Sequence, residues 1–261
     1  MELIDIGVNL TNKRLYNDVD DILNQAAEAG VKKMIVTGTS VEHSTMAVDL
    51  CERYPEQLYC TCGVHPHDAK TWNHAARQQI EQLLDHSCVR AIGETGLDFN
   101  RMYSPREQQI DAFQQQMDLA IECDLPLFLH QRDAFDTFHS LLREYRHQLN
   151  QIVVHCFTDS KKSLYQLLDL DCHIGITGWI CDERRGLELQ ALVRDIPPNR
   201  LMLETDAPYL LPRDLADPPA DKTNRPEYLP HILKTVARHQ GKPPGLLAEQ
   251  VLQTTEVFFG I

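Results

Sequence analysis

The sequence has 261 residues, a length at which an α/β barrel commonly forms one domain. Hydrophobic residues make up 43% and charged residues 24%, which is ordinary for a globular protein with a large core. Lys and Arg number 25 against 38 Asp and Glu, and the net charge of −13 argues against tight binding to duplex nucleic acid, which needs a basic surface. Because no stretch approaches a membrane span and the N-terminus lacks a signal-peptide pattern, we expect a cytosolic protein with no membrane partner.

Predicted strands alternate with predicted helices along the first half of the chain. Strands are expected at residues 3–8, 33–36, 58–64 and 89–92, and helices at residues 19–28, 41–54 and 73–85. After the fourth strand, Gly93 precedes Glu94, which we expect where the strand opens into a loop. Ser104 is the predicted N-cap of a helix over residues 104–123, with Pro105 at its first position and Glu107 completing a capping box.

The second half repeats the same unit. Strands are expected at residues 125–129, 152–154, 172–177 and 201–203, with helical segments at 134–146, 160–170 and 185–194. The cap and start of the last helix are expected at Asn224 to Pro226 with Leu229. Eight strands, each followed by a helical segment, predict a (β/α)8 TIM barrel that occupies residues 1–261 as a single domain. An open doubly wound sheet is the alternative, but no GxGxxG fingerprint follows the first strand.

Metal-ligand side chains follow four of these strands. In a (β/α)8 barrel the catalytic groups lie at the C-terminal ends of the strands, and these ends carry Glu94, His130, His155 and Asp206. Imidazoles and carboxylates at one register predict a metal site or a catalytic site. Glu204 lies one layer below Asp206 on the same face, where it either orients a ligand or pairs with a cation.

The eight cysteines contain no CxxC pair, and several lie in apolar strand candidates. We therefore expect buried, reduced thiols. Cys60 and Cys62 share one face of a strand, but no second pair of Cys or His matches them, so their spacing does not predict a zinc site.

Six motifs together resemble the TatD family of metal-dependent deoxyribonucleases. In chain order they are GVHPHD, IGETGLDF, LPLFLHQRDA, VVHCFTD, GITGW and LETDAPYL, and they span nearly the whole sequence. Two further motifs, CDERRG and LLPRDL, resemble the branch that gives the family its name. For that branch the resemblance implies a magnesium-dependent 3'-to-5' exonuclease that prefers single strands and is linked to DNA repair.

The resemblance also implies roles for individual residues. A divalent metal, Mg²⁺ with Mn²⁺ or Zn²⁺ as alternatives, is expected on Glu94, His130, His155 and Asp206, as one or two ions. Glu94 would bridge two ions, and Asp206 would act as ligand alone or also as general base. His65 either donates to a phosphate oxygen or supports a ligand.

One departure from the family pattern concerns the end of the first strand. Most family members carry an HxH pair there, and this chain has Gly7 and Asn9. Asn9 offers only a neutral oxygen, so we expect a second metal ion to be weakly bound. We expect Asn9 and Glu204 either to contact this second ion or to orient the residues that bind metal.

The substrate is expected to be a transiently bound single-stranded nucleic acid, DNA or RNA, handled by a monomer. Its phosphates and bases would meet side chains that follow the strand ends, which are Arg132, Arg184, Arg185, Trp179 and Tyr103. Two other functions stay open from the residues alone. One is a hydrolase of small substrates on the same barrel, and the other is a non-catalytic metal-binding or partner-binding relative.

Overall fold

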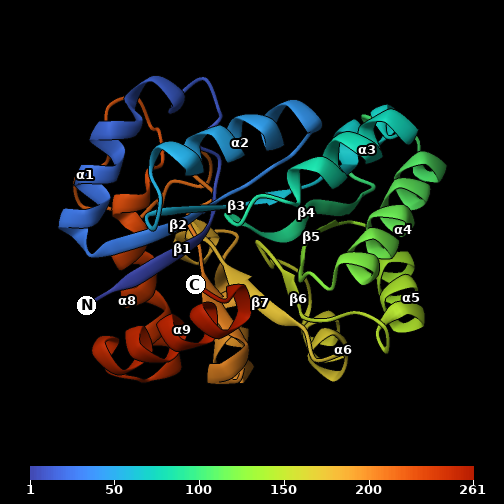
Figure 1. Ribbon diagram of the computed structural model, residues 1–261. Helices are drawn as coiled ribbons and strands as arrows, with labels where there is room; N and C mark the ends of the chain where they lie inside the picture. The colour runs from blue at the N-terminus through green and yellow to red at the C-terminus, as the bar shows by residue number, and fades with distance from the viewer. The chain divides into compact units, whose positions relative to one another are not determined.

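The computed structural model describes all 261 residues, and its eight strands form one sheet in the order β1 to β8 (Figure 1). The strand pairs β1–β2, β3–β4, β4–β5, β5–β6 and β7–β8 are all parallel, as the predicted (β/α)8 barrel requires. The chain forms two compact units. Unit 1 comprises Met1–Val36, Cys156–Leu164 and His173–Ile261, and unit 2 comprises Thr37–His155 and Tyr165–Cys172. That residues 1–261 act as one domain stays a prediction.

Unit 2 holds the middle strands and the helices between them. Its elements are α2 (Val41–Arg53), β3 (Leu58–Cys62), η2 (Pro66–Thr71), α3 (His74–Leu83), β4 (Val89–Asp98), α4 (Arg106–Cys123), β5 (Leu127–Arg132), α5 (Phe135–Tyr145) and β6 (Ile152–Val154). Helix α4 packs against β4 and η2 (Figure 1). Strands β3, β4 and β6 are almost wholly buried, as parallel strands covered by helices are, whereas β5 becomes more exposed toward its end.

Unit 1 holds the first and last strands. Its elements are β1 (Leu3–Val8), η1 (Tyr16–Asp18), α1 (Val19–Ala29), β2 (Val31–Val36), β7 (His173–Ile176), η3 (Gly178–Cys181), α7 (Leu187–Leu192), η4 (Val193–Asp195), η5 (Pro198–Arg200), β8 (Leu201–Leu203), η6 (Pro226–Tyr228), α8 (Leu229–Gln240) and α9 (Pro244–Phe259). Helix α6 (Lys161–Asp169) begins in unit 1 and ends in unit 2. None of the helices combines the length and apolar character needed to cross a lipid bilayer.

A buried carboxylate joins β1 to the segment that follows β8. Asp5 is completely buried, and it accepts hydrogen bonds from the backbone N–H of Thr205 (2.9 Å) and of Gly7 (3.2 Å) and from the Thr205 hydroxyl. Burial raises the pKa of Asp5 to about 7, although these hydrogen bonds oppose the change. Two backbone hydrogen bonds, Asp206 N to Gly7 O and Asn9 N to Ala207 O, both 2.8 Å, extend the same connection.

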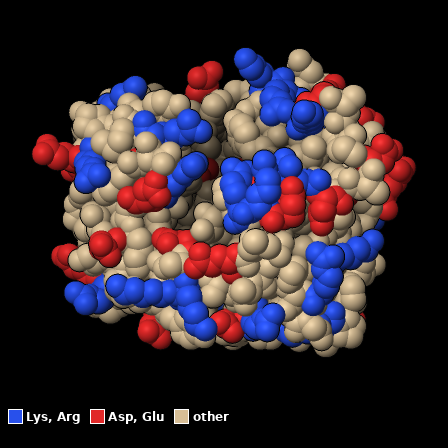
Figure 2. All heavy atoms as spheres, turned by 180° about the vertical axis from the view of Figure 1, so that it is seen from behind, with Lys and Arg blue, Asp and Glu red and all other residues tan.

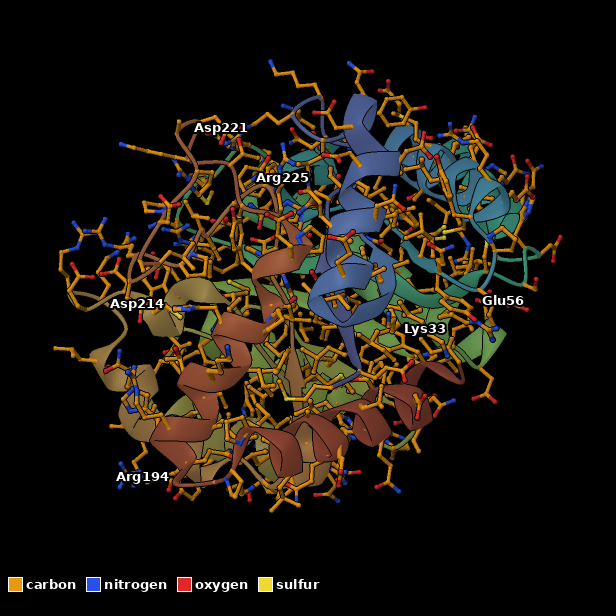
Figure 3. The ribbon with its side chains drawn as sticks, turned by 90° about the vertical axis from the view of Figure 1, so that its left-hand side faces the viewer. Lys33, Glu56, Arg194, Asp214, Asp221 and Arg225 are labelled. Carbon is orange, nitrogen blue, oxygen red and sulfur yellow. The ribbon has the colours of Figure 1, made fainter.

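The segment before α8 lies against α1. Arg225 donates to the Gln25 side chain (3.3 Å), and its guanidinium group is 3.6 Å from the carboxylate of Asp21 (Figure 3). Helix α1 ends at Gly30, whose φ of 98° is the left-handed conformation that glycine adopts readily at helix ends. These contacts hold the long connection after β8 on the surface of unit 1.

Three local predictions were wrong. Strand β4 continues through Glu94 to Asp98, because residues 95–98 keep pairing with β5. The N-cap of α4 is Pro105, since the Ser104 hydroxyl instead donates to His67 O and accepts from Lys70 N. Helix α8 is followed by a further helix, α9, which packs against it and against β8 and β1.

Candidate metal centre

Glu94 is placed by two glycines in β4. Gly93 and Gly96 have φ values of 143° and 137°, and a Cβ atom on either would lie about 2 Å from a backbone oxygen of β5, Phe128 O or His130 O. Only glycine therefore lets β4 approach β5 this closely while it changes direction on both sides of Glu94. The Glu94 N–H donates to Gly38 O (2.6 Å), which fixes the backbone at this position.

Two buried glutamines of α4 hold the strand ends that surround Glu94. Gln116 accepts from Val64 N (2.8 Å) and donates to Val64 O (3.0 Å) and to the Thr95 hydroxyl (2.7 Å), so one side chain connects the end of β3 to β4. Gln109 accepts from Asp98 N (2.9 Å) and donates to Asp98 O (3.0 Å). Both glutamines are completely buried, and a buried polar side chain with several partners fixes its surroundings strongly.

Three imidazoles converge on one carboxylate oxygen. Glu94 Oε1 lies 2.8 Å from His155 Nε2, 3.1 Å from His130 Nδ1 and 3.3 Å from His65 Nε2. We call His65, His130 and His155 together with Glu94 the imidazole cluster. The structure therefore brings four of the predicted site residues together within unit 2.

The electrostatics of the cluster favour an ionised Glu94. Burial alone would raise the pKa of Glu94, but the surrounding imidazoles, with His155 first, hold it well below its ordinary value. Burial lowers the pKa of His65 to about 4, so this imidazole is neutral at neutral pH. Burial opposes protonation of His130 too, yet the carboxylates of Asp98 and Glu94 raise its pKa.

The donor set of the imidazole cluster fits a divalent cation. Donor atoms of His65, Glu94 and His130 all lie within 4.8 Å of one another, and imidazole nitrogen and carboxylate oxygen are common ligands of such ions. His130 Nε2 is buried and lies 3.4 Å from Asp98 Oδ2 without forming a well-aligned hydrogen bond, and a buried polar atom of this kind needs an explanation. These observations fit a possible metal-binding group made of His and Glu.

Two residues of the centre were missed by the sequence analysis. His67 Nε2 lies 2.8 Å from Asp98 Oδ2, and the same oxygen is 3.4 Å from His130 Nε2. Burial would raise the pKa of Asp98, but the neighbouring imidazoles of His130 and His67 lower it. The sequence did contain signals for both residues. His67 follows His65 by two positions in the GVHPHD motif, and Asp98 is the Asp of IGETGLDF.

Asp206 lies in unit 1 with its own partners. Asn9 donates its side-chain N–H to Asp206 Oδ1 (3.0 Å) and to Ala207 O (3.2 Å), so its amide nitrogen rather than its oxygen faces the carboxylate. Glu204 is completely buried and accepts from Cys156 N (2.5 Å), the residue directly after His155. That Asp206 shares a cation with Glu94, and that Glu204 and Asn9 support ligands, stay predictions.

The predicted substrate residues differ in their surroundings. Arg184 and Arg185 both contact the carboxylate of Asp182 (3.1 and 3.0 Å), and the Arg185 guanidinium lies 4.2 Å from the ring centre of Trp179. Tyr103 is exposed, and its ring packs edge-on against His67 at 4.8 Å between ring centres.

Arg132 lies exposed at the end of β5. On the face shown in Figure 2, basic side chains lie interspersed with acidic ones. Such a mixed surface does not provide a continuous basic path for a duplex, in keeping with the net charge of −13.

Comparisons with known proteins agree with the fold. A family model described as TatD related DNase matches residues 4–260. A relative from Pectobacterium atrosepticum, named 3'-5' ssDNA/RNA exonuclease TatD, is 49% identical over 92% of this chain and 92% of its own. A relative of the same name from Salmonella typhimurium is 45% identical over 99% of each chain. The solved structure of a TatD homologue from Escherichia coli K12 has a TM-score of 0.91 at 28% identity and covers 99% of this chain and 98% of its own. The chain therefore belongs to the family of TatD-related DNases.

Proposed function

We propose that this protein is a metal-dependent exonuclease that degrades single-stranded DNA and RNA from the 3' end. The observation that carries the proposal is the convergence of three imidazole nitrogens on Glu94 Oε1. It occurs in a chain that is 45–49% identical to relatives named 3'-5' ssDNA/RNA exonuclease. We further propose that the protein acts as a monomer in the cytosol.

Mg²⁺ is the proposed cation, with Mn²⁺ and Zn²⁺ as alternatives, and one or two ions are bound. Glu94, His130 and His155 would hold the first, and Asp206 would complete the site. Bound there, a divalent cation supplies Lewis-acid stabilisation of the phosphoryl oxygens and makes a water molecule acidic enough to ionise near neutral pH. The neutral side chain of Asn9 and the absence of a side chain at Gly7 support weak holding of a second ion.

The protein's own groups prepare the site for this chemistry. Glu94 is ionised because the imidazoles lower its pKa, so it is ready to bind a cation without first losing a proton. His130 has a raised pKa, and its proton must leave before its nitrogen can act as a ligand. Asp206, which accepts from Asn9, is the proposed general base or an additional ligand.

Substrate handling is assigned to residues near the strand ends. Exposed Tyr103 packs on His67, one imidazole away from the cluster, and offers a ring on which a base can stack. Trp179 offers a second ring, and Arg132, Arg184 and Arg185 would contact phosphates. Because Asp182 partly neutralises Arg184 and Arg185, these residues would bind nucleic acid with low affinity, as a transiently bound substrate requires.

The test is a nuclease assay on single-stranded DNA and RNA carrying a label at either end. Wild type is compared with His130→Ala and Asp206→Asn in Mg²⁺, Mn²⁺, Zn²⁺ or EDTA. The control is His147→Ala, which removes an exposed imidazole from the turn after α5. We expect stepwise shortening from the 3' end that EDTA abolishes, that the control retains and that both site variants lose.

Other outcomes of this assay would reject the proposal. Activity that survives in His130→Ala and Asp206→Asn would exclude these residues from the chemistry. Shortening from the 5' end would refute the polarity, and no activity with any cation would favour a hydrolase of small substrates or a non-catalytic protein.

A further inference from the structure

Three cysteines that are distant in the sequence meet in unit 2. Cys51 lies in α2, Cys60 in β3 and Cys88 directly before β4, and their sulfur atoms all lie within 4.8 Å of one another. We call these three residues the thiol cluster. The turn that carries Glu56 joins α2 to β3 and brings Cys51 back to Cys60 (Figure 3). A backbone hydrogen bond from Cys60 N to Cys88 O (3.0 Å) holds the third member beside β3.

We propose that the thiol cluster binds one thiophilic d10 cation, Zn²⁺ in the cell, as a structural site separate from the imidazole cluster. Soft thiolate sulfur is the donor that selects such ions, and three sulfurs leave the fourth tetrahedral position to water. The sequence spacing alone does not predict this site, because Cys60 and Cys62 lack a second CxxC-like pair.

The geometry needs little change to accommodate a cation. Zinc–sulfur bonds of about 2.3 Å place two tetrahedral sulfur ligands roughly 3.8 Å apart. Sulfur atoms that are already within 4.8 Å of one another must therefore approach by no more than about 1 Å. Cys51 and Cys60 are buried, whereas half-buried Cys88 leaves a route for the ion and for the water molecule that completes its coordination.

Cation binding at this cluster requires the thiols to lose their protons. A thiolate is the form that binds a metal, so the three thiols would release protons to the solvent as the cation enters.

The location indicates a structural rather than a catalytic role. Cys88 lies directly before β4 and precedes Glu94 by six positions, a separation of at most roughly 20 Å at about 3.3 Å per residue. The thiol cluster thus lies at the N-terminal end of β4, the end of barrel strands associated with stability. A cation there would tie α2, β3 and β4 together at the base of the strand that carries Glu94.

The test uses Cd²⁺ alone as the probe. The full-length protein is reduced, stripped of metal and titrated with Cd²⁺ while the ultraviolet sulfur-to-cadmium charge-transfer band is followed. This band reports thiolate ligands and is silent for a cation held by imidazole and carboxylate. We expect saturation at one equivalent, release of protons, a higher melting temperature, and competition by Zn²⁺.

Variants distinguish the thiol cluster from other cysteines. Cys88→Ala is expected to abolish the band, and it is the mildest change because Cys88 is only half buried. Two controls are expected to keep it. Cys172→Ala removes a buried thiol elsewhere in unit 2, and Cys181→Ala removes the thiol of a separate Cys181, Asp214 and His231 group.

Three results would overturn the proposal. The first is a wild-type protein that gives no charge-transfer band. The second is a band that persists in Cys88→Ala, provided that circular dichroism shows a folded variant. The third is that wild type purified without reductant has two fewer free thiols than the reduced protein, and that Cys88→Ala does not show this loss. That result would identify the cluster as a disulfide-forming pair.

Discussion

Asp5 is expected to make the stability of this protein fall as the pH rises toward neutrality. The carboxyl group is completely buried, and burial raises its pKa from 3.8 to about 7. Between these two values the unfolded chain has lost the Asp5 proton, and the folded chain still holds it. Raising the pH in this range therefore lowers the free energy of unfolding by about 1.4 kcal/mol per pH unit. The total decrease in the free energy of unfolding approaches about 4 kcal/mol above pH 7.

Asp5→Asn removes this dependence while it keeps the shape of the side chain. The amide oxygen can still accept from the N–H groups of Thr205 and Gly7, and no proton is exchanged. Urea unfolding of wild type and variant at half-unit steps from pH 5 to 8 measures the difference. Wild type is expected to lose roughly 2–3 kcal/mol relative to the variant between pH 5 and 7.

The control for this prediction is Asp49→Asn, which removes an exposed carboxylate from α2. Its pH profile is expected to run parallel to that of wild type. If the profiles of wild type and Asp5→Asn were parallel, the buried carboxyl group would have the same pKa in the folded and unfolded chains, and the reasoning would fail.

Two further substitutions test how β4 is positioned, each by urea unfolding. Gly96→Ala is expected to lower the free energy of unfolding by at least about 3 kcal/mol, because the added Cβ would overlap a backbone oxygen and the backbone φ is 137°. The control Gly245→Ala should lower it by less than about 0.5 kcal/mol, because nothing lies within 4 Å of the added Cβ. Equal costs would contradict the close approach of β4 and β5. Gln116→Leu is expected to lower the free energy of unfolding by about 3 kcal/mol, because it leaves the buried N–H and C=O of Val64 without these partners. The control Gln108→Leu changes an exposed residue of the same helix and should leave the free energy of unfolding nearly unchanged. A small effect of Gln116→Leu would mean that water replaces the lost hydrogen bonds.

The fold was predictable because its signals are local. Apolar runs separated by helical periodicity predicted all eight strands, with every strand end except that of β4 within three residues, and parallel strands bring their C-terminal ends to one edge. That rule was enough to predict Glu94, His130 and His155 as neighbours from three separate strands. Helix α9 was also signalled, by Pro243 before an amphipathic run, and was overlooked.

The remaining features depend on tertiary contacts that the sequence pattern does not show. Strand β4 extends to Asp98 only because Gly96 lets it follow β5, and this extension places Asp98 beside His67. Ser104 is diverted from the helix cap by partners that lie more than 30 residues away. The thiol cluster likewise joins residues from three elements, and no spacing rule relates them.

The most direct measurement of the central claim is the exonuclease rate of Glu94→Gln on 3'-labelled single-stranded DNA in Mg²⁺. This change keeps the size of the side chain but removes the charge on which the three imidazoles converge. If Glu94 holds the catalytic cation, the rate should fall by at least about 100-fold in a variant that circular dichroism shows to be folded. A rate within a few-fold of wild type, in a variant that still needs Mg²⁺, would contradict the account.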